Sequence, residues 1–94
     1  MRFEWDSAKA ASNLRRHKVS FDEATTVFRD PLARMVDDPD HSVEEREIAI
    51  GHSLLNRLLF VFFTEREAGT VRIFSARAAT RSERKEYEER EKNY

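Results

Sequence analysis

The side chains best suited to chemistry in this sequence are arginines, lysines, histidines and a tyrosine, rather than paired carboxylates, thiols or a Ser/His/Asp set. Arginine suits phosphate because its planar guanidinium donates paired hydrogen bonds and stays charged at any working pH. A cluster of arginines on a sheet could hold a nucleic-acid backbone and stabilise a pentacoordinate phosphoryl transition state. Such a site could cleave RNA without a metal, with a base removing the 2′-hydroxyl proton and an acid protonating the departing 5′-oxygen.

Several of these cationic side chains fall near the ends of predicted strands. The strand-end arginines are Arg46, Arg57, Arg66, Arg72 and Arg77. The groups that could transfer protons are Lys9, His17, Glu45, His52 and Tyr87. Arginines at strand ends are usually solvated or paired with a neighbouring glutamate, so their number alone does not establish a site.

Strand alternation gives two of the arginines a particular position. Arg46 falls on the same face as Ile48, in a row that ends with His52. Arg77 falls on the same face as Ile73, again at the end of an apolar row. Charges at the ends of buried rows either pair locally or line a cleft, and the sequence leaves both alternatives open.

Three consecutive strands are predicted to position these side chains. Residues 45–52 and 70–77 alternate in the period-2 pattern of a strand with one buried face. Residues 58–63, LLFVFF, form an unbroken apolar run, so we expect a central strand that is covered on both faces. The short connections at residues 53–56 and 67–69 favour an antiparallel meander.

Two helices are predicted before these strands, following a short extended segment at the N-terminus. Asp6 is a good N-cap for a helix that runs to about His17. Ser20 and Glu23 form a capping-box pattern that starts a second helix, which ends at Asp30–Pro31. One face of the first helix, which we expect to be solvated, carries Lys9, Asn13 and His17.

A further strand and a last helix complete the predicted fold. Residues 32–36 are predicted as the first strand of the sheet. Thr80 and Glu83 form a second capping box, and the helix they open has little to bury beyond Tyr87, so we expect it to be held weakly. The fold class is therefore α+β: two N-terminal helices, a three- to four-stranded antiparallel sheet and a C-terminal helix, in one domain spanning residues 1–94.

Charge is distributed unevenly along the chain. The 17 basic and 18 acidic residues nearly cancel, which excludes a uniformly polycationic nucleic-acid binder. Residues 37–47 contain six acids and one base, a local balance of −5. Because the whole chain carries −1, the remainder carries +4. The sequence thus combines one acidic loop with a mildly basic body.

Several classes of protein are disfavoured by composition. The absence of cysteine excludes a disulfide framework and fits a reducing cytosol. The three histidines lack metal-ligand spacing, and the acidic loop at residues 37–42 matches no calcium-binding pattern, so we expect no metal and no cofactor. The N-terminus lacks an apolar signal region and no segment could span a membrane, so we expect a cytoplasmic protein.

Blocks along nearly the whole chain resemble the BrnT toxins in order and spacing. These blocks are FEWD at residues 3–6, Lys9, Asn13, RHKVSF at 16–21, VFRDP at 27–31, EEREIAIG at 44–51, VFFTERE at 61–67 and VRIFSARAATRSERKEYEE at 71–89. BrnT proteins are the toxin halves of bacterial type II toxin–antitoxin modules. The resemblance implies a small RelE-like fold and a ribonuclease activity that arrests translation. It also implies neutralisation by BrnA, a ribbon-helix-helix antitoxin that binds its own operator DNA, with a heterotetramer by analogy.

The resemblance also implies roles for individual residues. Arg46 and Arg77 occupy family-motif positions and become the leading catalytic or RNA-contact candidates. Lys9 and His17 come next as catalytic candidates. The further RNA-binding candidates are His52, Arg72, Arg81, Arg84 and Tyr87. The family usually has glycine where this chain has Lys18, so Lys18 either adopts a strained left-handed conformation or marks an altered turn.

Two other functions remain compatible with these residues. One is a catalytically inert module that pairs with an antitoxin and assists operator repression, which suits the near-neutral charge and the lack of an obvious acid–base pair. The other is a general RNA-binding or phosphate-binding domain that has no partner gene.

Overall fold

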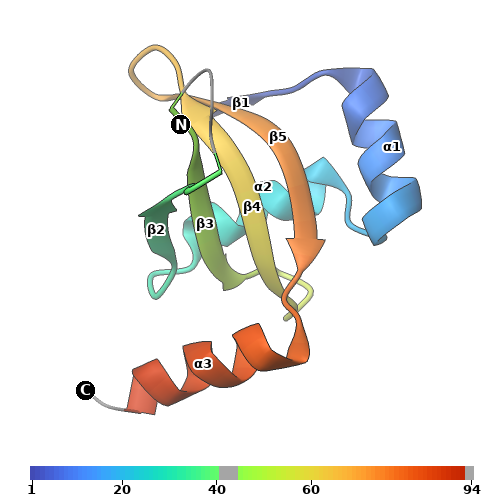
Figure 1. Cartoon of the computed structure of the whole chain (residues 1–94). Helices are drawn as coiled ribbons and strands as arrows, with labels where there is room; N and C mark the ends of the chain where they lie inside the picture. Colours follow the sequence, from blue (N-terminus) through green and yellow to red (C-terminus); the bar gives the residue numbers. More distant parts are fainter. Residues whose placement is uncertain (41–44, 93–94) are drawn as a thin grey trace.

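A computed structural model describes residues 1–40 and 45–92 and shows an α+β fold built on one sheet (Figure 1). The elements in chain order are β1 (Arg2–Glu4), α1 (Ser7–His17), α2 (Phe21–Thr26), the 3-10 turn η1 (Val27–Arg29), β2 (Arg34–Asp37), β3 (Glu47–His52), β4 (Leu58–Glu65), β5 (Thr70–Ala78) and α3 (Arg81–Lys92). The strand order is β1-β5-β4-β3-β2. The predicted central strand, β4, does lie at the centre of the sheet.

The sheet has one strand more than predicted, and it is mixed rather than purely antiparallel. The pairs β2–β3, β3–β4 and β4–β5 are antiparallel, but β1 pairs with β5 in parallel, with Phe3 opposite Val71. The expectation of three or four antiparallel strands was therefore wrong at the N-terminus. A strand of three residues is too short to show a period, and its partner lies almost seventy positions further along the chain.

The helix starts follow the predicted caps. Asp6 Oδ1 accepts hydrogen bonds from the backbone N–H groups of Ala8 and Lys9 at 2.8 and 3.1 Å. These bonds to the charged form hold the pKa of Asp6 below its ordinary value. Lys18 ends α1 with φ 59° and ψ 30°, which is the left-handed conformation, so the first alternative for this position is confirmed.

The capping box predicted for α2 is only half formed. Ser20 Oγ accepts the N–H of Glu23 at 3.0 Å, as expected. The Glu23 carboxylate instead accepts a hydrogen bond from Ser53 Oγ at 2.7 Å and forms an ion pair with Arg57. The Arg57 hydrogen bonds, opposed by burial, lower the pKa of Glu23. The carboxylate thus ties α2 to the β3–β4 connection.

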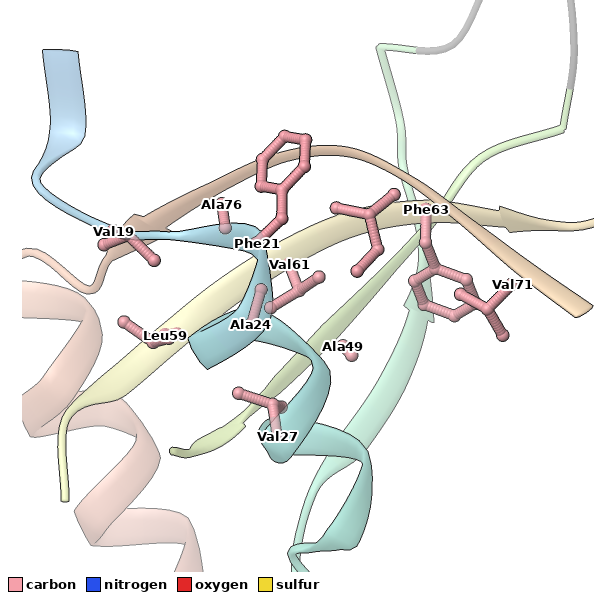
Figure 2. Packing of buried hydrophobic residues seen from close by; sticks show 11 residues of the cluster. Val19, Phe21, Ala24, Val27, Ala49, Leu59, Val61, Phe63, Val71 and Ala76 are labelled. Atoms are coloured by element: carbon pink, nitrogen blue, oxygen red, sulfur yellow. The ribbon is translucent and has the colours of Figure 1, made fainter. Parts of the chain in front are cut away.

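The main core lies between α2 and one face of the sheet (Figure 2). From β3 and β4 it takes the row with Ala49, Leu59 and Val61, all completely buried. The expectation that the apolar row of Ile48 is the buried face of β3 was therefore wrong in part, because that row lies on the face opposite the main core. There Ile48 is nearly buried, and Ile50 packs against α3.

A β-bulge changes which side chains of β5 face the core. Phe63 pairs with Ile73, but Phe62 pairs with Ser75, so one extra residue of β5 lies between the two pairs. Val71 and Ile73 are buried on the core side, and after the bulge Ala76 is buried there too. Arg77 therefore does not share the face of Ile73, as strict alternation predicted, and lies on the other side of the sheet.

We call this other side the open face, defined by Phe60, Phe62, Phe74 and Arg77. In Figure 1, α2 lies behind the sheet, α1 lies beside β5, and α3 lies beneath one end of the strands. Tyr87 of α3 packs with Leu58 and Ala79 in a second small cluster that includes Phe60. Tyr87 is the one buried side chain of α3 over residues 81–90, so the helix has little else to bury, as expected.

Candidate functional site

Two cations from different elements meet over one ring on the open face. The ring is Phe74, which lies in the bulged part of β5 and is half-buried. Arg46, just before β3, places its guanidinium carbon 4.5 Å from the ring centroid, and Lys9 of α1 places its Nζ 5.6 Å away. No carboxylate within residues 1–40 and 45–90 forms an ion pair with Arg46.

Arg77 lies on the same face but is held by a carboxylate. Its guanidinium carbon is 4.6 Å from the centroid of Phe60 and 5.9 Å from that of Phe62. Nη1 and Nη2 donate to the two carboxylate oxygens of Glu83 at 2.8 and 3.0 Å. These bonds, opposed by burial and helped by the N–H of Thr80, lower the pKa of Glu83 to about 2.

Arg72 also belongs to the open face, because it pairs with Thr64, two residues from Phe62 on β4. Its Nη1 donates to a carboxylate oxygen of Glu4 on β1 at 3.0 Å. Arg66 approaches the same carboxylate at 3.6 Å. One carboxylate thus faces two guanidinium groups at this edge of the sheet, so part of their positive charge remains unbalanced.

A second group of predicted residues lies at the α3 end of the sheet. The rings of His52 and Tyr87 meet edge to face at 5.8 Å, and the Tyr87 hydroxyl donates to the carbonyl of Leu32 at 3.1 Å. His52 Nδ1 is 3.8 Å from a carboxylate oxygen of Asp30. Tyr87 therefore anchors α3. A polar hollow beside it is lined by His52, Asn56, Arg57, Leu58, Ala78, Arg84 and Glu88.

The structure separates the remaining candidates from the open-face group. His17 ends α1, eight residues beyond Lys9, which is about 12 Å along the helix axis. Arg81 is exposed at the start of α3. Of the nine predicted site residues, the structure therefore gathers Lys9, Arg46, Arg72 and Arg77 on the open face. It places His52, Arg84 and Tyr87 together at the α3 end.

Asn13 positions the Lys9 side of α1, and the expectation that this helix face is solvated was wrong at Asn13, although Lys9 itself is exposed. Asn13 is 6% exposed, and its amide bonds to both the N–H and the carbonyl of Ala76 at 3.1 and 2.8 Å. Its Nδ2 also donates to the carbonyl of Val19 at 2.9 Å. The side chain therefore pairs with β5 as a neighbouring strand would. Lys9, one helical turn earlier, is thereby brought toward Phe74.

The aromatic residues of the open face were missed as functional candidates. Phe60 and Phe62 were assigned to a strand covered on both faces, whereas both are only half-buried. The available signal was the alternation of phenylalanine with smaller residues along β4, together with Phe74 on the same side of β5 as Arg72. A row of rings beside arginines is a recurrent composition of sheet surfaces that bind RNA.

Neither a cluster of metal-ligating side chains nor a membrane-spanning helix is present in the described part of the chain. Residues 1–40 and 45–90 contain no group of three or more His, Cys, Asp or Glu side chains that could hold a metal ion. Part of the acidic loop, residues 41–44, lies outside the described residues. No helix in the described part of the chain is both long and apolar enough to cross a bilayer.

Comparisons with known proteins agree with this architecture. The profile of one family, described as the ribonuclease toxin BrnT of type II toxin–antitoxin systems, matches residues 5–83. The fold is similar to the crystal structure of the Brucella abortus ribonuclease toxin BrnT, with a TM-score of 0.66. That alignment has 22% sequence identity and covers 86% of this chain and 99% of the other. A search among curated proteins found no match.

Proposed function

Because the chain belongs to the BrnT family of ribonuclease toxins of type II toxin–antitoxin systems, we propose that RNA is bound and cleaved on the open face of its sheet. The observation that carries this proposal is the convergence of Arg46 and Lys9 on Phe74, with Arg77 on the same face. Three cations from α1, the β3 start and β5 thus line one surface. A phosphodiester backbone is the polyanion that such a surface fits.

The three cations contribute in different ways. Arg46 and Lys9 bind phosphate oxygens of the substrate, because both cations lie over the same ring and Arg46 has no ion pair within residues 1–40 and 45–90. Arg77 offers two parallel donors, and the Glu83 carboxylate occupies the position that a phosphate group would take. Arg72 extends the cationic surface toward β1.

In this mechanism the guanidinium groups stabilise the charge that develops on the phosphoryl oxygens, and no metal is required. The 2′-hydroxyl attacks the adjacent phosphorus as it loses its proton, and the 5′-oxygen leaves as it gains one. Lys9 lies over Phe74 together with Arg46 and is the candidate from α1 for proton transfer. His17, about 12 Å further along α1, is placed to contact a neighbouring nucleotide.

The test is cleavage of RNA by the purified protein and its arginine variants. We expect Arg46→Ala and Arg77→Ala each to lower the cleavage rate roughly 100-fold or more, which is the usual loss when one transition-state donor is removed. Arg29→Ala is a matched control, because Arg29 is exposed on η1, beside the core that covers the opposite face. If Arg46→Ala and Arg77→Ala both cleave RNA at the rate of the wild type, the assignment of these residues to the site is refuted.

The cellular role follows from the family and is part of the same proposal. The protein acts in the cytoplasm, where its cleavage of RNA arrests translation. A BrnA-like ribbon-helix-helix antitoxin neutralises it, forms a heterotetramer with it and carries the complex to operator DNA. Induced expression should stop growth, and co-expression of the neighbouring antitoxin gene should restore it. Size measurement of the co-purified complex tests the stoichiometry.

An alternative function is supported by the state of Arg77. Glu83 holds both outer nitrogens of this guanidinium, so of the three proposed phosphate-binding cations only Arg46 and Lys9, over Phe74, form no ion pair with a carboxylate in the described part of the chain. A member in which this pair never opens would act through antitoxin binding and operator repression alone. Protein that leaves RNA intact at high concentration, yet strengthens antitoxin binding to operator DNA, would favour this alternative.

A further inference from the structure

The aromatic side chains of the open face offer more than support for the cations. Phe60 and Phe62 on β4 and Phe74 on β5 lie on neighbouring strands and point to the same side of the sheet. None of the three is fully buried. Rings in this arrangement can stack with nucleobases, and every base has a face for such stacking.

Arg46 extends this stacking surface. With its guanidinium carbon 4.5 Å from the centroid of Phe74, the group covers the ring. A guanidinium in this position has a second planar face, on which a nucleobase can stack, while its N–H edges still reach a phosphate. The ring, the guanidinium and a base then form one stack, with Lys9 beside it.

The charges on the open face are too few to bind RNA tightly by themselves. Arg77 is paired with Glu83, and Arg72 shares Glu4 with Arg66. With Arg46 and Lys9 as the two phosphate contacts, the logarithm of affinity would change with the logarithm of salt by a slope of only about −1.4 for a single strand. Stacking of one base contributes roughly 1–3 kcal/mol, so it is comparable with the phosphate contacts.

We propose that Phe74, with Arg46 stacked on it, is a base-stacking platform that selects unpaired nucleotides as the substrate. This inference rests on the proposed function and specifies its substrate. In an RNA duplex the base faces are hidden in the helical stack, and the ring of Phe74 cannot reach them. A single strand, a loop or a bulge leaves them free. Phe74 is thus a residue that determines specificity for RNA structure.

The experiment compares the affinity of three 2′-O-methyl RNA ligands, which lack the 2′-hydroxyl nucleophile and so resist cleavage. The ligands are a single-stranded octamer, the same octamer paired with its complement, and an octamer with abasic positions. For the single strand, Phe74→Leu should weaken binding about tenfold, by a factor that stays constant with salt. Phe74→Tyr, which keeps the ring, should retain the affinity of the wild type.

Phe28→Leu is the matched control for this substitution. Phe28 is also half-buried, but it packs against Phe3 and Phe63 on the core side of the sheet. The control should lose stability without losing affinity for the octamer. Circular dichroism of both variants reports whether they fold. The wild type and Phe28→Leu, which both keep the ring of Phe74, should bind the abasic octamer at least fivefold more weakly than the complete one, whereas Phe74→Leu should bind the two about equally.

Several results would overturn the inference while leaving the proposed function intact. One is that Phe74→Leu loses as much affinity for the abasic octamer as for the complete one. Another is that Phe28→Leu loses as much affinity for the complete octamer as Phe74→Leu does. The third is that the duplex binds the wild type as tightly as the single strand. A different result, in which wild-type protein binds its antitoxin but binds and cleaves no RNA, would overturn the proposed function itself.

Discussion

Glu83→Gln is the substitution that tests most directly whether Arg77 on β5 is restrained by the Glu83 carboxylate on α3. The carboxylate accepts two hydrogen bonds from Arg77, and a phosphate group of RNA would need the same two donors. The Arg77 and Glu83 side chains are 31% and 29% exposed, so solvent screens the pair and separating it costs about 1 kcal/mol. Glutamine keeps the oxygen that caps the N–H of Thr80 but loses the charge.

We expect this variant to bind RNA about fivefold more tightly, because without the carboxylate Arg77 is free to make one phosphate contact, which at this exposure is worth roughly 1 kcal/mol. The affinity should also become more sensitive to salt, with a slope steeper by about 0.7, since one more phosphate is contacted. Fluorescence anisotropy with the 2′-O-methyl octamer between 50 and 200 mM salt, a range of roughly fourfold, measures both quantities.

The pKa of Glu83 determines how the stability of the same variant depends on pH. The folded-state pKa of about 2 lies below the ordinary value of 4.5, so the stabilisation is complete above pH 4.5 and is lost as the pH falls toward 2. Glu83→Gln should therefore unfold about 1 kcal/mol more easily at pH 7. Its difference from the wild type should disappear in acid, as urea denaturation at several pH values would show.

Glu86→Gln is the control, because Glu86 lies on the same helix and pairs with Arg90 rather than Arg77. It removes the same charge and should change neither the affinity nor the salt slope by more than a small amount. If Glu83→Gln binds RNA with the affinity and salt slope of the wild type, Arg77 does not contact phosphate and the reasoning about its restraint is refuted.

Two further substitutions test local features of the fold by chemical denaturation. Asn13→Ala should lower the free energy of unfolding by at least ~2 kcal/mol, because it leaves the buried N–H and carbonyl of Ala76 without their partner. The control Ser12→Ala should change the free energy of unfolding by no more than about 0.5 kcal/mol. Equal effects of the two substitutions would contradict the role of the Asn13 amide. Lys18→Gly should stabilise the protein by about 1 kcal/mol, because φ 59° suits glycine. Asn56→Gly, at φ 60°, should gain less, since asparagine tolerates this conformation.

Much of the fold could be predicted from sequence because its signals are local. Asp6, Ser20 and Thr80 mark the starts of the three helices, and each accepts the expected bond from its own helix. The strands begin and end within two residues of their predicted bounds, since their alternation is visible in a few residues. An extended segment was predicted at the N-terminus, but its pairing into the sheet as β1 was missed. Three residues show no alternation, and the partner of Phe3, Val71, is distant in the sequence.

The candidate site was less predictable, because it depends on contacts between distant segments. Because of one bulged residue in β5, Arg77 lies on the open face, and the alternation of residues along this strand does not predict the bulge. The pairing of Arg77 with Glu83 depends on how the chain turns into α3. Arg46 was placed correctly by alternation, but its partner Phe74 comes from a strand two positions across the sheet.

The amide of Asn13 has a consequence for how copies of this protein can associate. β1 covers only three residues of the β5 edge, so the rest of that edge would leave backbone hydrogen-bonding groups open to pairing with another molecule. At Ala76 the Asn13 amide already bonds to these groups. At that edge of the sheet, an added strand could pair only with β1. The opposite flank, β2, is four residues long and mostly exposed. Two molecules that pair through their β2 strands would leave no comparable free edge for a third molecule. Such an association therefore ends as a dimer and does not grow into a fibre.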